Sequence, residues 1–75
     1  MLDEVIAVLR DGERIQVGGG RSFSWYAMKD GQLVIINSCD GELEEYPCSE
    51  ERLSAAIAEA PHVFADAVRW WKEKR

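Results

Sequence analysis

Three Asp-Gly dipeptides divide the first half of this 75-residue chain into short segments. They are Asp11-Gly12, Asp30-Gly31 and Asp40-Gly41, and each lies between apolar or alternating runs. Asp-Gly accommodates the two positive φ values of a type I′ turn, whose twist matches that of the antiparallel strands it joins. The repeated dipeptide therefore predicts an antiparallel meander.

Five strands are expected around these turns. The first is apolar on both faces, as in a central or barrel strand, and the last is heavily acidic, as in an edge strand protected against pairing. On the third, Phe23 and Trp25 alternate with smaller residues, and we assign them to the core. In chain order the expected strands are Glu4–Arg10, Glu13–Val17, Arg21–Lys29, Gln32–Ser38 and Glu42–Tyr46.

Residues 49–75 are expected to be helical. Ser49 is placed to cap the first turn, where Glu50 and Glu51 add the negative charge that the helix dipole favours. Pro61 interrupts the segment, which is either one kinked helix or two short ones. A straight helix would be about 39 Å long, too long for this chain, which favours a break near residues 60–62. An apolar stripe recurs at spacings of three and four residues, at Leu53, Ile57, Ala60, Phe64, Ala67 and Trp71.

The predicted fold class is α+β, as one domain over residues 1–75. The antiparallel meander occupies residues 1–47 and is curled or forms a half-closed barrel. The C-terminal helical segment, kinked or broken at Pro61, packs on it.

The balance of charge disfavours direct nucleic-acid binding. Fourteen acidic and nine basic residues give a net charge of −5, whereas phosphate contacts need clustered Lys and Arg. Phe23, Trp25 and Tyr26 have the aromatic character to stack on bases, but the low pI of about 4.7 argues against this role.

The chain is expected to be cytoplasmic, without a membrane partner. Asp3 and Glu4 occupy positions where a signal peptide carries positive charge. No segment approaches the roughly 18–20 apolar residues of a membrane span. Cys39 and Cys48 would lie roughly 20 Å apart in the simplest hairpin, too far for a disulfide, so two free thiols are expected.

The motifs do not favour an enzyme, a cofactor or a metal. Gly18-Gly19-Gly20 lies between expected strands instead of opening a helix, so a connector or bulge is favoured over a phosphate cradle. Cys39, Cys48 and His62 have spacings unlike those of a zinc ribbon or finger. The many carboxylates would need a cleft to act as a glycosidase acid and base, and a chain of this size has little room for one.

Nearly all the net charge lies in residues 39–51, which contain six acidic residues and no basic one. On the last expected strand Glu42, Glu44 and Tyr46 share a face, which makes a row of carboxylates ending in an aromatic ring. Such a row can meet a Lys- or Arg-rich groove, although a plain solvated edge strand remains the alternative. The candidate partner-binding residues are Asp40, Glu42, Glu44, Glu45, Tyr46, Glu50 and Glu51.

A second candidate surface lies beside the apolar stripe of the helical segment. Ala56, Val63 and Trp70 widen the apolar arc beyond what one layer of a small sheet needs. Trp is also favoured at interface hot spots. These three residues are candidates for self-association or for contact with a partner; alternatively, Trp70 is a core residue that covers the end of the barrel.

These features predict a small acidic, non-enzymatic protein-interaction module. The more specific hypothesis is an inhibitor that blocks a basic, nucleic-acid-binding surface of a larger protein, by analogy with the small acidic inhibitors that phages and mobile elements encode. The alternative is a self-associating accessory or structural subunit, a homodimer in the simplest case, that uses the apolar helix face.

Overall fold

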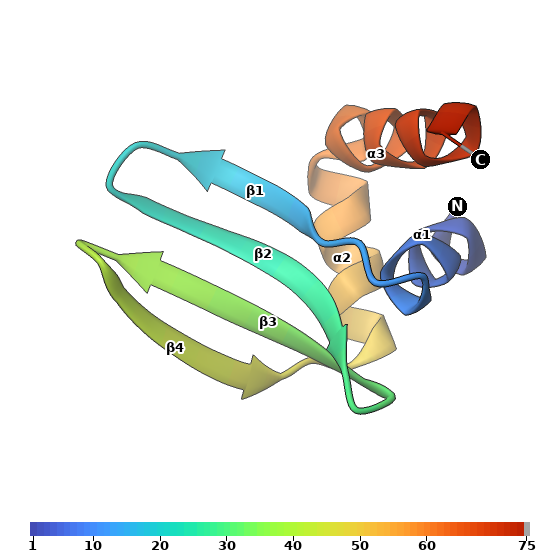
Figure 1. Cartoon of the computed structure of the whole chain (residues 1–75). Helices are drawn as coiled ribbons and strands as arrows, with labels where there is room; N and C mark the ends of the chain where they lie inside the picture. Colours follow the sequence, from blue (N-terminus) through green and yellow to red (C-terminus); the bar gives the residue numbers. More distant parts are fainter. Residues whose placement is uncertain (75) are drawn as a thin grey trace.

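The computed structural model, which describes residues 1–74, contains three helices and a four-stranded antiparallel sheet (Figure 1). The strands follow one another across the sheet in the order β1-β2-β3-β4. The α+β class is confirmed, but the sheet is open and not closed into a barrel. Arg75, the end of the expected helical segment, lies outside the described residues. The elements are α1 (Leu2–Arg10), β1 (Ile15–Gly19), β2 (Ser22–Lys29), β3 (Gln32–Cys39), β4 (Glu42–Pro47), α2 (Glu50–Glu59) and α3 (Pro61–Lys74).

The prediction of a strand over Glu4–Arg10 is wrong, because this segment lies within α1. A short apolar run cannot by itself distinguish a buried strand from a buried helix. The charged residues at the two ends of the run favour the helix. Asp3 and Glu4 lie in its first turn and Arg10 in its last, as the helix dipole favours. The sheet therefore has four strands and not five. The buried residues of α1 are Val5, Ile6, Val8 and Leu9.

Asp11-Gly12 ends this helix and does not form a hairpin turn. Asp11 is the C-cap, with a φ of −79°, and its backbone N–H donates to Ala7 and Val8 carbonyls. Gly12 follows with a φ of 92° and donates to the Leu9 carbonyl at 3.1 Å. A glycine with positive φ just beyond the last turn is a common helix ending, so the same dipeptide serves two purposes in this chain.

The other two Asp-Gly pairs form the predicted turns. Asp30 and Asp40 have φ values of 52° and 49°, and each is followed by a glycine with positive φ. The β1–β2 turn is made differently, by Gly20 and Arg21, with a φ of 75° at Gly20. The expectation that Gly18-Gly19-Gly20 forms a connector or bulge is therefore corrected. Gly18 and Gly19 are the last two residues of β1, and only Gly20 lies in the turn.

The C-terminal segment is two helices. Ser49 caps α2 as predicted, and its Oγ accepts the Arg52 backbone N–H at 3.1 Å. Helix α2 ends at Glu59, and Pro61 is the first residue of α3. Proline fits this position because the first helical N–H has no partner within the helix. There is thus a break, not a kink in a continuous helix. Leu53, Ile57, Phe64 and Trp71 of the expected stripe are buried, together with Val68.

The helices pack on one face of the sheet, which we call the inner face. Directly opposed residues in an antiparallel sheet point to the same side, and Tyr26 is opposed by Ile15 on β1 and Ile35 on β3. The Tyr26 ring lies 5.9 Å from that of Phe64 on α3. Ile15, Tyr26 and Leu33 are the strand residues that join the main core.

Phe23 and Trp25 point to the other side, the outer face. Both are half-buried, and neither belongs to the core cluster nor packs against it. Their assignment to the core is therefore wrong. The alternation of residues along the strand correctly places both rings on one face of the sheet. It does not indicate which face the helices cover.

The helices cover only part of the inner face. Beyond Tyr26 and Ile35 this face becomes polar, and the Ser24 hydroxyl donates to Asn37 Oδ1 at 2.6 Å. Every residue of β4 is exposed. The tips of the β1–β2 and β3–β4 hairpins accordingly project beyond the helices (Figure 1).

Both cysteines are free thiols. Cys39 is exposed and is opposed by Glu42 across the β3–β4 turn, as predicted. Cys48 is part of the core, and its burial raises the pKa of the thiol above its ordinary value.

No helix within residues 1–74 has both the length and the apolar character needed to cross a membrane.

Substituting the glycine that ends α1 tests its reassignment. A Cβ at Gly12 or at Gly19 would meet no atom within 4 Å, but only Gly12 has a positive φ. We expect Gly12→Ala to lower the free energy of unfolding by about 1–2 kcal/mol, and Gly19→Ala to change it by less than about 0.5 kcal/mol. Urea unfolding followed by far-UV circular dichroism measures both. Equal effects would contradict the αL ending of this helix.

Candidate partner-binding surfaces

A hollow lies on the inner face of the projecting β3–β4 hairpin. It is lined by Asn37, Cys39, Asp40, Glu42 and Glu44, and we call it the acidic hollow. Asp40 comes from the type I′ turn, and the two glutamates alternate along β4, so all three carboxylates reach the same side. The local geometry of one hairpin is enough to bring them together.

The carboxylates of the acidic hollow are not neutralised by this part of the protein. Within residues 1–74, Asp40, Glu42 and Glu44 form no ion pair. Glu44 instead accepts a hydrogen bond from the Tyr46 hydroxyl, two residues along the same strand. That bond and the adjacent negative charge raise the pKa of Tyr46 above its ordinary value. Three acidic side chains thus remain available to an external cation.

Tyr46 marks the boundary of this negative region. It contributes to a neighbouring hollow together with Ile35, Asn37, Pro47 and Arg52. Arg52 comes from the first turn of α2 and brings positive charge to that side. The negative surface therefore ends at the tyrosine ring, as the sequence pattern suggested for the row of carboxylates.

The remaining predicted partner-binding residues lie elsewhere. Glu45 is opposed by Ile36 and points to the outer face, where it pairs with Lys29 at 3.1 Å. Glu50 and Glu51 are exposed in the first turn of α2, where the helix dipole favours them. The structure thus gathers only part of the predicted set into one site.

The three helical candidates do not form a common exposed patch. Ala56 on α2 and Val63 on α3 are half-buried and pack against the core of the chain itself. Trp70 is 55% exposed, and the Lys74 ammonium lies 4.5 Å from the centre of its ring. Trp70 is therefore the member of this set that is most accessible to another molecule.

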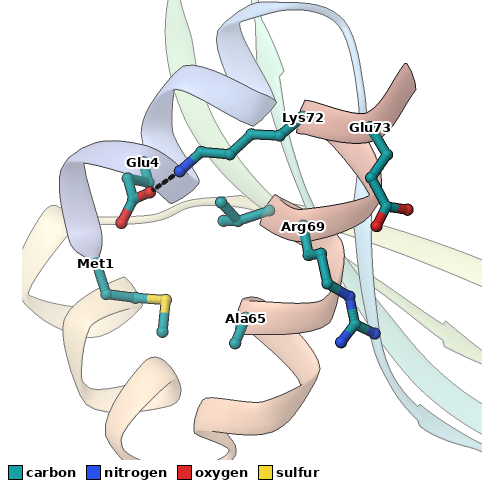
Figure 2. Close-up of a pocket in the computed structure, with 7 residues that line it drawn as sticks. Met1, Glu4, Ala65, Arg69, Lys72 and Glu73 are labelled. Carbon is teal, nitrogen blue, oxygen red and sulfur yellow. Dashed lines mark hydrogen bonds and ion pairs between the residues drawn. The ribbon is translucent and has the colours of Figure 1, made fainter. Parts of the chain in front are cut away.

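A groove between α1 and α3 was missed by the sequence analysis (Figure 2). Met1, Ala65 and Val68 give it an apolar lining, and an ion pair of 2.6 Å between Glu4 and Lys72 crosses its edge. Hydrogen bonding to Lys72 and its positive charge lower the pKa of Glu4. The sequence did not indicate this groove, because residues 4–10 were expected to form a strand. In the helix that they form instead, Glu4 lies against α3.

The histidine, cysteine and glycine motifs considered for metal or phosphate binding are not gathered into a site. Among the described residues, the His, Cys, Asp and Glu side chains form no group of three that could hold a metal ion. His62 is exposed in the first turn of α3, and the Gly18-Gly19-Gly20 segment leads into a hairpin turn and not a helix.

Comparison of the chain with protein-family models, curated proteins and solved structures found no match. Its function is therefore argued from the chemistry of its own surfaces.

The contact between Tyr46 and Glu44 can be tested by titration. We expect Glu44→Gln to bring the pKa of Tyr46 down toward its ordinary value of 10.0, since the substitution removes the charge that favours the protonated phenol. Glu42→Gln, a change in the same row, should alter it less. Ring-carbon NMR shifts follow Tyr46 separately from Tyr26. An unchanged Tyr46 pKa in Glu44→Gln would contradict a close contact between the phenol and the Glu44 carboxylate.

Proposed function

We propose that this chain is a small protein-interaction module that docks its acidic hollow on a basic surface of a larger protein. The observation that carries the proposal is the cluster of Asp40, Glu42 and Glu44, which form no ion pair within residues 1–74. The cluster lies on a hairpin that projects beyond the helices (Figure 1), so a partner can approach it without meeting the helical layer.

Electrostatics supports binding to a cationic partner. The net charge of −5 gives the whole molecule an attraction for basic surfaces, which speeds encounter. The three carboxylates then set the register, and the exposed Tyr46 ring at their border offers contact area at a low cost in side-chain entropy.

A basic surface that holds nucleic acid is the specific target we propose. Carboxylates at alternating strand positions present the same sign of charge as a phosphate backbone, so they would compete for the same Lys and Arg side chains. The module would then act by occlusion, without chemistry of its own. Inhibition of this kind, as in small proteins of phages and mobile elements, and a cytoplasmic site of action both belong to this proposal.

Self-association through the helical layer is the second candidate function. The observation that favours it is the exposure of Trp70, because tryptophan is enriched among residues that dominate interface energies. Sedimentation of Trp70→Ala tests it: a wild-type dimer that persists in this variant does not use Trp70 as its contact.

Paired charge reversals test the leading proposal. Glu42→Lys with Glu44→Lys inverts the acidic hollow, while Glu59→Lys with Glu73→Lys makes the same change in net charge on exposed positions of α2 and α3. Each protein is used as bait in the source organism, and captured proteins are quantified by mass spectrometry. We expect a nucleic-acid-binding protein that is retained by the wild type and the helix variant and lost by the hollow variant.

Binding measured with the purified partner then separates the effect of the acidic hollow from the effect of net charge. The affinity should fall steeply with added salt, and the hollow variant should bind at least about tenfold more weakly than the helix variant, as expected for reversal of charges at a contact. A hollow variant that binds as tightly as the wild type, or a helix variant that is equally impaired, would refute docking through Asp40, Glu42 and Glu44.

A further inference from the structure

The outer face of the sheet is apolar at its centre, and none of its side chains belongs to the core cluster. Phe23 and Trp25 stack on one another with ring centroids 5.6 Å apart, and the Arg14 guanidinium lies 4.8 Å from the centre of the Trp25 ring. Val34 is buried although it is not a member of the core cluster, and Leu43 is 62% exposed. Domains built of layers normally bury the apolar face of a sheet against a further layer.

The side chains of the outer face form rows that the strand register defines. One row contains Gly18, Phe23, Ser38 and Leu43, and the next contains Gln16, Trp25, Ile36 and Glu45. In both rows the residues on β1 and β2 differ in size or charge from those on β3 and β4. This asymmetry is what a self-complementary surface requires.

We propose that a second copy of this chain packs on the outer face, related by a two-fold axis that runs parallel to the strands between β2 and β3. This axis lays β1 of one copy over β4 of the other and β2 over β3. Each row then meets the same row of the second copy in reverse order. The result is a sandwich of two sheets with the helices on its outside, an arrangement in which facing sheets pack about 10 Å apart.

Side-chain size matches across this axis. Phe23 lies over Ser38 of the second copy, which is only 7% exposed in the monomer, and the exposed Leu43 lies over Gly18, so large residues meet small ones in the first row. In the second row Trp25 faces Ile36, an aromatic–aliphatic contact at the centre of the interface. Alternation of large and small residues lets two sheet faces interdigitate without voids.

Charge favours this axis over a two-fold axis that crosses the strands through the row of Trp25. Gln16 faces Glu45 of the second copy, and Arg14, held over Trp25 in the same row, lies beside that pair; the symmetry forms this contact twice. Glu45 also pairs with Lys29 of its own chain at 3.1 Å, so Arg14 adds a second cation near the same carboxylate. A two-fold axis that crosses the strands through this row would instead bring β1 onto β1 and β4 onto β4, which sets arginine near arginine and glutamate near glutamate. Like charges placed together in this way oppose association.

The interface is small, so the dimer should be weak. Four strands spaced about 4.8 Å apart and about six residues long project onto roughly 400 Å² per copy, or about 800 Å² in total, which is below the roughly 1,000 Å² of a stable specific interface. We therefore expect a reversible monomer–dimer equilibrium. The proposal is independent of the acidic hollow, which lies on the inner face and stays accessible in the dimer.

Sedimentation equilibrium over about a 100-fold range of concentration measures this equilibrium. We expect Trp25→Ser to raise the dimer dissociation constant at least about tenfold. Leu43→Gln, at an exposed position that should not disturb folding, should raise it as well, while Trp70→Ala on the helical layer should leave it unchanged. Circular dichroism of each variant establishes that it is folded.

Mixing two charge variants tests the axis itself. Arg14→Glu alone and Glu45→Arg alone each place like charges near one another and should be mainly monomeric. An equimolar mixture of the two should form a heterodimer, since every neighbouring pair is then oppositely charged. Each variant serves as the control for the other, because any disturbance within one chain is present both alone and in the mixture.

Four results would overturn the proposal: a wild type that is monomeric throughout, a dimer that Leu43→Gln leaves intact, a dimer that Trp70→Ala abolishes, or a mixture that does not associate. A monomer whose tryptophan fluorescence is quenched by a single-stranded oligonucleotide, with the quenching lost in Trp25→Ser, would assign the outer face to base stacking instead.

Discussion

The change of polarity along the inner face of the sheet determines where the helices lie. Ile15, Tyr26 and Leu33 offer an apolar surface near the β2–β3 turn, and the helices bury it. Beyond it, the Ser24 hydroxyl donates to Asn37 Oδ1, and this polar pair offers nothing apolar to cover. The hairpin tips are left exposed as a consequence, and the acidic hollow exists because no helix extends over them.

One strand gives the two sides of the projecting hairpin opposite properties. Along β4, Glu42 and Glu44 point to the inner side while Leu43 and Glu45 point to the outer side. Two surfaces of different chemistry therefore lie back to back, a few ångströms apart. In the arrangement we propose, the outer one joins two copies and the inner one meets a basic partner, so that a dimer would carry two acidic hollows, one on each side of the sandwich.

Helix α3 is held at its C-terminal end by residues near the start of the chain. Trp71 donates its indole N–H to Asp11 at 2.8 Å, Lys72 pairs with Glu4, and Lys74 pairs with Glu13. Charge-assisted bonds of this kind hold the last helix beside the first. The acid that follows α1 is thus both its C-cap and an anchor for a tryptophan far along the chain.

The sequence by itself determined the features that depend on near neighbours: the type I′ turns at Asp30 and Asp40, the Ser49 cap, the interruption at Pro61, and the shared face of Glu42, Glu44 and Tyr46. Only the tertiary structure decided the rest. Val5 to Leu9 became a helix because its apolar side had a core to join, and Asp11-Gly12 then served as its ending. The face carrying Phe23 and Trp25 was left uncovered, and Glu45, which strand alternation already places opposite to Glu42 and Glu44, acquired Lys29 as its ion-pair partner. Local rules give each side chain a direction relative to its own backbone, but which surface another segment buries depends on contacts between residues far apart in the chain.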